Sequence, residues 1–140
     1  MTTPDRDNHD GVIGGDQSAG IAVHIIAADK LTSEKVVNEE GQHLGEIKHL
    51  MIDLHAGKIV YAVLSFGGFL GLGDKLFAVP WGSLAFDMDN QWFVLNVTKE
   101  RLKNAPGFDK DHWPAMADTR WAAEVHGYYG PVAASRRPFI

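Results

Sequence analysis

The 140-residue sequence predicts one mainly β domain, a small barrel of about six short strands with one or two C-terminal helices. First, short runs rich in β-branched and aromatic residues recur between turn signals from residue 35 to residue 97. Second, no helical periodicity separates these runs, which disfavours a βαβ fold. Third, helix signals appear only after residue 98.

The expected strands follow one another with short turns between them. They cover residues 35–38, 44–54, 58–66, 74–79, 84–87 and 91–97. Gly57 lies in the turn after the second strand, where glycine can adopt a positive φ. Ile47, Leu50 and Ile52 are the expected core residues of that second strand.

Two of the expected strands are apolar on both faces. In the run 59–64, Ile59, Tyr61 and Val63 alternate with Val60, Ala62 and Leu64, and the run 92–97 shows the same pattern. A barrel has only one inside, so the second face of each strand needs another cover. That cover is either the C-terminal segment or a second subunit.

Two capping residues mark the expected helices. Thr98 precedes the run 99–105, which must end before Pro106, and Asp118 precedes the run 119–129. In the second run Trp121, Val125 and Tyr128 recur at helical spacing on one face. Between the helices, Phe108 and Trp113 are expected to pin a loop to the barrel.

The chain divides into three parts. Residues 1–20 are polar and glycine-rich, with four aspartates and one arginine giving a net charge of −3, so a disordered tail is expected there. Residues 21–114 form the expected barrel domain, and residues 115–140 form a helical extension and tail.

Several short motifs in the middle of the chain occur in one known family. They are Val36-Val37-Asn38, Gly41, Leu44-Gly45-Glu46-Ile47, Ile52-Asp53, Gly57-Lys58, Tyr61-Ala62-Val63, the run 65–71 and Phe77-Ala78-Val79-Pro80-Trp81. Together they resemble the PRC-barrel domain, the small β-barrel of the photosynthetic reaction centre H subunit and of a bacterial 16S ribosomal RNA processing factor. The resemblance spans about residues 27–110, and the segment 108–121 resembles an extension of short stand-alone members.

The resemblance implies interaction rather than catalysis, because the family's barrels mostly serve as binding modules. The chain departs from the family pattern at His49, where the family often has Asp.

Composition excludes several classes of function. The chain has no cysteine, which excludes disulfides, thiolate metal sites and a cysteine nucleophile. Its net charge of −5 argues against nucleic acid as a partner. No apolar stretch approaches the length of a membrane span, and the N-terminus lacks the features of a signal peptide, so the expected location is the cytoplasm.

The run 67–75 is the most unusual loop of the sequence. Its glycines are Gly67, Gly68, Gly71 and Gly73, and its apolar residues are Phe69, Leu70 and Leu72. It is not a P-loop, because Asp74 separates Gly73 from Lys75 and a strand follows, although its backbone amides could form an anion nest. The apolar residues would either fold back on the barrel or form a contact with a subunit or partner, and we predict the contact.

No catalytic or metal site is expected. His43, His49 and His55 are spaced by six residues, which places neighbours about 20 Å apart along a strand and prevents joint ligation of one metal unless the chain folds back. The serines lack the Gly-x-Ser-x-Gly context of a nucleophile elbow.

The sequence therefore predicts a non-enzymatic interaction module without a cofactor. It would self-associate as a homodimer or higher oligomer and bind a protein partner through Phe69, Leu70, Leu72, Trp113 and Trp121. Two alternatives stay open. One is a small-molecule or ion binder that uses the glycine-rich loop or the histidines. The other is an accessory factor in ribosomal RNA maturation, or a protein peripheral to a membrane complex.

Overall fold

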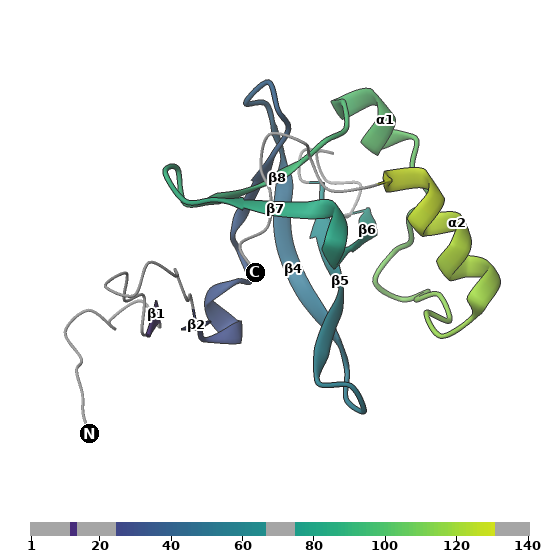
Figure 1. Cartoon of the computed structure of the whole chain (residues 1–140). Helices are drawn as coiled ribbons and strands as arrows, with labels where there is room; N and C mark the ends of the chain where they lie inside the picture. Colours follow the sequence, from purple (N-terminus) through teal and green to yellow (C-terminus); the bar gives the residue numbers. More distant parts are fainter. Residues whose placement is uncertain (1–11, 14–24, 67–74, 131–140) are drawn as a thin grey trace.

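A computed structural model describes residues 12–13, 25–66 and 75–130, and its centre is a six-stranded sheet curled into a half-barrel (Figure 1). The strand order is β6-β5-β4-β3-β8-β7. The strands are β3 (Lys35–Val37), β4 (His43–Asp53), β5 (Lys58–Ser65), β6 (Leu76–Pro80), β7 (Leu84–Asp87) and β8 (Trp92–Leu95). The predicted mainly β fold with C-terminal helices is confirmed.

Outside the large sheet, β1 (Val12–Ile13) pairs antiparallel with β2 (Ile25–Ile26), and a 3₁₀ turn, η2 (Ala28–Lys30), leads from β2 toward β3. The strand β1 falls within residues 1–20, and the rest of that stretch lies outside the described part of the chain.

The β4–β5 hairpin is the longest element of the sheet. Its register runs from Glu46 opposite Ser65 to Asp53 opposite Lys58, with irregularities between Ile47 and His49 and between Met51 and Ile52. The Asp53 carboxylate closes the turn by accepting the backbone N–H groups of His55 and Ala56 at 3.0 and 3.1 Å. Gly57 takes a φ of +68°, as expected for this turn.

The far end of this hairpin extends beyond its neighbours in the sheet (Figure 1). The pairing of β3 with β4 reaches only to Glu46, and the pairing of β6 with β5 begins at Tyr61. The stretch around Ile52 and Ile59 therefore forms a two-stranded projection from the sheet.

The register separates an inner and an outer face of the sheet. On the inner face, Ala62 and Leu64 of β5 lie opposite Val79 and Phe77 of β6. On the outer face, Tyr61 and Val63 lie opposite Pro80 and Ala78. The largest side chains with almost no exposure are Phe77, Leu44, Ile47, Leu64, Leu95, Leu102, Val36, Val63, Val79, Val94 and Val125.

The helix α2 (Thr119–Tyr129) covers the outer face of β5 and β6 in the same chain (Figure 1). The Trp121 ring packs edge-on against Tyr61 with centroids 5.2 Å apart, and the Tyr61 hydroxyl lies 3.4 Å from Nε2 of His126. At the end of η3 (Trp81–Ser83), the Ser83 hydroxyl donates to the Gly130 carbonyl at 2.7 Å. The cover of this two-faced strand is thus the C-terminal helix.

The second two-faced strand, β8, has a smaller outer cluster. Val94 packs with Val37 and the half-buried Trp92, on the face opposite Val36 and Phe93. The Lys35 ammonium lies 5.0 Å from the centroid of the Trp92 ring.

Both helices begin at the predicted caps. The Thr98 hydroxyl accepts the N–H of Arg101 in α1 (Lys99–Lys103), and the Asp118 carboxylate accepts the N–H groups of Arg120 and Trp121. The helix α1 ends at Lys103, two residues before the predicted end. These caps fix where each helix starts relative to the sheet.

Arg101 and Tyr128 clamp the two helices together. The Arg101 guanidinium donates to the Tyr128 carbonyl at 2.8 Å, while the Tyr128 hydroxyl donates to the Arg101 carbonyl at 2.5 Å. The guanidinium also lies 4.1 Å from the centroid of the Tyr128 ring. This reciprocal contact holds the C-terminal end of α2 in place.

The neighbouring Tyr129 is buried with an unpaired hydroxyl. Its side chain is 5 % exposed, and within the described residues its hydroxyl has no hydrogen-bond partner. Burial raises the pKa of this hydroxyl far above its usual value, so it stays neutral.

We expect Tyr129→Phe to stabilise the fold by about 1 kcal/mol, because it removes an unsatisfied polar group and keeps the ring. Urea unfolding measures this, with Tyr128→Phe as the matched control, which loses a hydrogen bond and is destabilised. A loss of stability in Tyr129→Phe would show that its hydroxyl is satisfied.

Candidate protein-interaction surface

The hairpin projection carries apolar side chains that remain exposed. Ile52 is 49 % exposed and Leu54 is 90 % exposed, and the half-buried Ile59 lies opposite Ile52. Ile52 and Ile59 are a register pair, so their side chains lie on the same side of the hairpin. We call Ile52, Leu54 and Ile59 the hairpin surface.

The hairpin surface corrects one expectation from the sequence. Ile47 is fully buried and Leu50 is half-buried, but Ile52 is not a core residue. Its strand continues past the ends of β3 and β6, so no neighbouring strand extends the core to its position.

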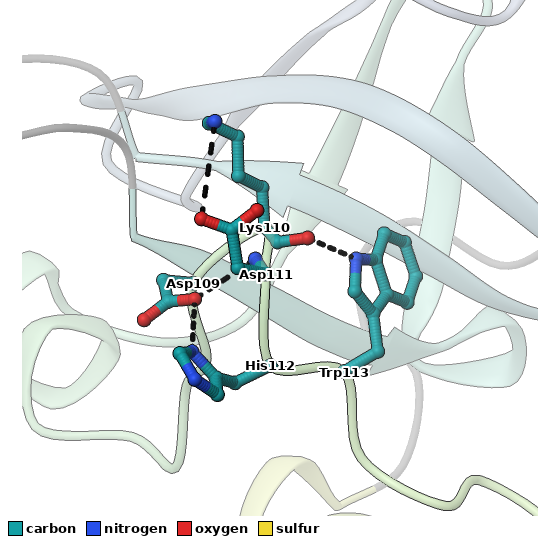
Figure 2. A network of polar contacts seen from close by, with 5 residues as sticks. All are labelled: Asp109, Lys110, Asp111, His112 and Trp113. Carbon is teal, nitrogen blue, oxygen red and sulfur yellow. Dashed lines mark hydrogen bonds and ion pairs between the residues drawn. The ribbon is translucent and has the colours of Figure 1, made fainter.

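Trp113 lies on the outer face of the sheet, against β4, and is 39 % exposed. Its ring packs edge-on against His49 of β4 at 5.3 Å and tilted against Phe108 at 4.9 Å. Its indole N–H donates to the Lys110 carbonyl at 2.9 Å (Figure 2). His49 pairs with Val63, which fixes the face on which Trp113 lies.

The loop that carries Trp113 is held by its own polar contacts (Figure 2). The Asp109 carboxylate accepts from the His112 ring at 2.8 Å and from the Asp111 N–H at 2.9 Å. The hydrogen bond with His112 is the main cause that lowers the pKa of Asp109. Lys110 and Asp111 form an exposed ion pair at 4.0 Å. These contacts shape the loop, and Trp113 stays partly exposed on it.

Addition of a partner strand is hindered at the described edge of β6. Leu76 exchanges two backbone hydrogen bonds with Phe108, both at 2.8 Å. Pro80, at the other end of β6, has no N–H to donate. The two irregularities of the β4–β5 pairing, one at Lys48 of β4 and one at Val60 of β5, also break the regular edge of the hairpin. A partner would therefore contact side chains rather than extend the sheet at these edges.

The structure places two of the predicted contact residues. Trp113 is partly exposed, whereas Trp121 is half-buried against Tyr61 and serves as part of the α2 cover. The other predicted residues lie outside the described residues: Phe69, Leu70, Leu72, Gly67, Gly68, Gly71 and Gly73. The sequence did not lead us to predict Ile52 and Leu54 as exposed contact residues, although their position beside a turn was a signal for exposure.

Comparison with known families decides the class of this half-barrel. A model of the PRC-barrel domain matches residues 24–102, more than half of the chain. The chain belongs to the PRC-barrel family. None of the curated proteins compared with it matches.

The PRC-barrel match covers the whole six-stranded sheet and ends inside α1. The PRC-barrel fold is a known interaction module, and the family is generally non-enzymatic. The loop with Trp113 and the helix α2 follow the matched range, so they are additions that cover part of the outer face of the PRC barrel.

Two further findings concern other classes of site in this PRC-barrel protein. In residues 25–66 and 75–130, no three His, Asp or Glu side chains converge in a way that could hold a metal ion. No helix among the described elements has the length and apolar character needed to cross a bilayer.

Proposed function

We propose that this PRC-barrel protein is a non-enzymatic interaction module that binds a protein partner through the hairpin surface, with Trp113 as a second exposed contact. The observation that carries the proposal is the exposure of Ile52 and Leu54, at 49 % and 90 %, on a hairpin that projects past the ends of β3 and β6.

The exposed side chains have the composition of a binding site. Burying a leucine or isoleucine side chain contributes roughly 1.5–3 kcal/mol, so the hairpin surface offers a substantial gain to a partner. Tryptophan is enriched among residues that dominate binding energies, and Trp113 presents part of its ring next to His49. The blocked edge of β6 directs a partner toward these side chains.

We expect Ile52→Ser/Leu54→Ser to lose the partner while the fold is retained. Both side chains are exposed, so the substitution should change the free energy of unfolding by less than about 1 kcal/mol. A tagged pull-down from the native host, with circular dichroism of each variant, measures this. The matched control is Met88→Ser, which alters an apolar side chain 40 % exposed in the turn between β7 and β8.

Equal recovery of the partner by wild type and by the folded Ile52→Ser/Leu54→Ser variant would contradict the proposal. Loss of the partner with Met88→Ser, and not with Ile52→Ser/Leu54→Ser, would place the binding site on the β7–β8 hairpin instead.

Self-association stays a prediction. Its argument from β5 is weakened, because α2 of the same chain covers that face. Sedimentation of wild type and Ile52→Ser/Leu54→Ser at several concentrations would test it. The alternatives of a ligand-binding glycine loop and of a role in ribosomal RNA maturation stay predictions as well, as does the cytoplasmic location.

A further inference from the structure

The helix α2 lies outside the part of the chain that matches the PRC-barrel family. The matched range, residues 24–102, contains all six strands of the sheet, so every strand pair of the sheet forms within it. The face that α2 covers is apolar and belongs to the matched range, with Tyr61 and Val63 of β5 among its buried residues. The helix is thus an added cover on a face that the barrel itself provides.

Side chains rather than backbone pairing hold α2 against the sheet. Within the described residues, four hydrogen bonds link the segment 114–130 to the rest of the chain, and each of them involves a side chain. One of them, between Tyr61 and His126, is long at 3.4 Å. The other three lie at the C-terminal end of the helix, on Tyr128 and Gly130. The first turns of α2 are therefore held to the sheet by packing.

That packing is limited, and two features of the helix weaken it. Of the 11 residues of α2 only Val125 and Tyr129 are buried, and the Tyr129 hydroxyl has no hydrogen-bond partner in the part of the chain that the structure describes. Burial of an unpaired hydroxyl costs free energy that opening recovers. Gly127 lowers the helix propensity, although a Cβ atom there would meet nothing within 4 Å. Opening of α2 should therefore cost less free energy than unfolding of the sheet.

The segment 114–118 can serve as the hinge of this opening. In residues 25–66 and 75–130, no hydrogen bond joins it to the sheet, and its Met116 side chain packs against the core but stays half-buried. The loop before it is fixed, because Phe108 exchanges two backbone hydrogen bonds with β6 and Trp113 packs against His49. Movement of α2 would therefore leave that loop and the sheet in place.

We propose that α2 is a lid that opens as one unit while the six-stranded sheet stays folded. Opening uncovers the outer face around Tyr61, and the closed helix withholds that face from other molecules. An isolated helix of 11 residues is marginal in water, so the amide hydrogens of α2 exchange once it detaches. The lid involves none of the residues of the hairpin surface, so its failure would leave the proposed function standing.

Amide hydrogen exchange of the full chain, followed by NMR, tests the lid. The amides of residues 123–128 should exchange through opening of α2, and those of residues 61–64 through unfolding of the sheet. We expect nearly uniform protection factors in α2, at least about a hundredfold below those of β5. Gly127→Ala should raise the protection factors of α2 about fivefold, because alanine favours the closed, helical state.

Ile47→Val is the matched variant that separates opening of α2 from unfolding of the sheet. Ile47 is fully buried and lies opposite Leu64 on the inner face. Loss of one methyl group there should lower the protection factors of β5 about fivefold and leave those of α2 unchanged. Equal protection of α2 and β5, falling together in Ile47→Val, would overturn the lid. Fast exchange confined to the last residues of α2 would also overturn it, because that pattern is fraying of a helix end.

Discussion

Gly45→Val is expected to leave the chain unfolded. A Cβ atom at Gly45 would fall on the carbonyl oxygen of Ser65, and would lie 3.2 Å from the Ser65 carbonyl carbon and 3.4 Å from Cα of Phe66. These are backbone atoms of the strand and loop facing β4, so they cannot rotate away as a side chain would. The clash is relieved only if β4 and β5 move apart. These two strands join β6 on one side to β3, β8 and β7 on the other, so their separation would divide the sheet.

Gly45→Ala is the smaller substitution, and its effect on the free energy of unfolding can be measured. Ordinary overpacking costs about 1–3 kcal/mol, and a clash with backbone should reach at least about 3 kcal/mol. Since total stability of a domain is roughly 5–15 kcal/mol, the alanine variant should fold weakly and the valine variant should fail. Urea unfolding followed by circular dichroism measures both.

Gly82→Ala is the matched control for Gly45→Ala. A Cβ at Gly82 meets no atom within 4 Å, so its free energy of unfolding should change by less than about 0.5 kcal/mol. Equal urea midpoints for the two alanine variants would mean that β4 and β5 do not approach as closely as described.

Val125→Asp is expected to detach α2 from the sheet. Val125 is 2 % exposed on the face of α2 that packs on the barrel. An unpaired carboxylate there loses its hydration without gaining a partner, which should destabilise the packed state by about 3–5 kcal/mol. Detachment would uncover Tyr61 and Val63, so binding of a hydrophobic dye should rise as the urea midpoint falls.

Ala123→Asp is the control for Val125→Asp, because it places the same carboxylate on the exposed side of the same helix. It should unfold close to wild type and bind no additional dye. If the two variants behaved alike, α2 would not be the cover of the outer face.

Features set by local sequence were predicted correctly. Thr98 and Asp118 cap their helices because a side-chain oxygen near the first turn satisfies free N–H groups. Gly57 marks its turn because glycine tolerates a positive φ. The motifs of the middle strands were sufficient to indicate the PRC barrel, which the family match confirms.

Features set by distant parts of the chain were not predictable. Whether α2 or a second subunit covers β5 depends on how the loop with Trp113 crosses the sheet. Ile52 was expected in the core because its strand pattern is apolar, but its exposure depends on where β3 and β6 end. Trp121 was predicted as a partner contact, and helical periodicity alone cannot distinguish that role from its packing on Tyr61.

The most direct test of the central claim is photo-crosslinking from the hairpin surface. A photoreactive amino acid replaces Leu54 in one variant and Met88 in another, since both sites are exposed and apolar. After irradiation in the native host, we predict a discrete adduct with another protein from position 54 and none from position 88. An adduct from position 88, with none from position 54, would contradict binding at the hairpin surface.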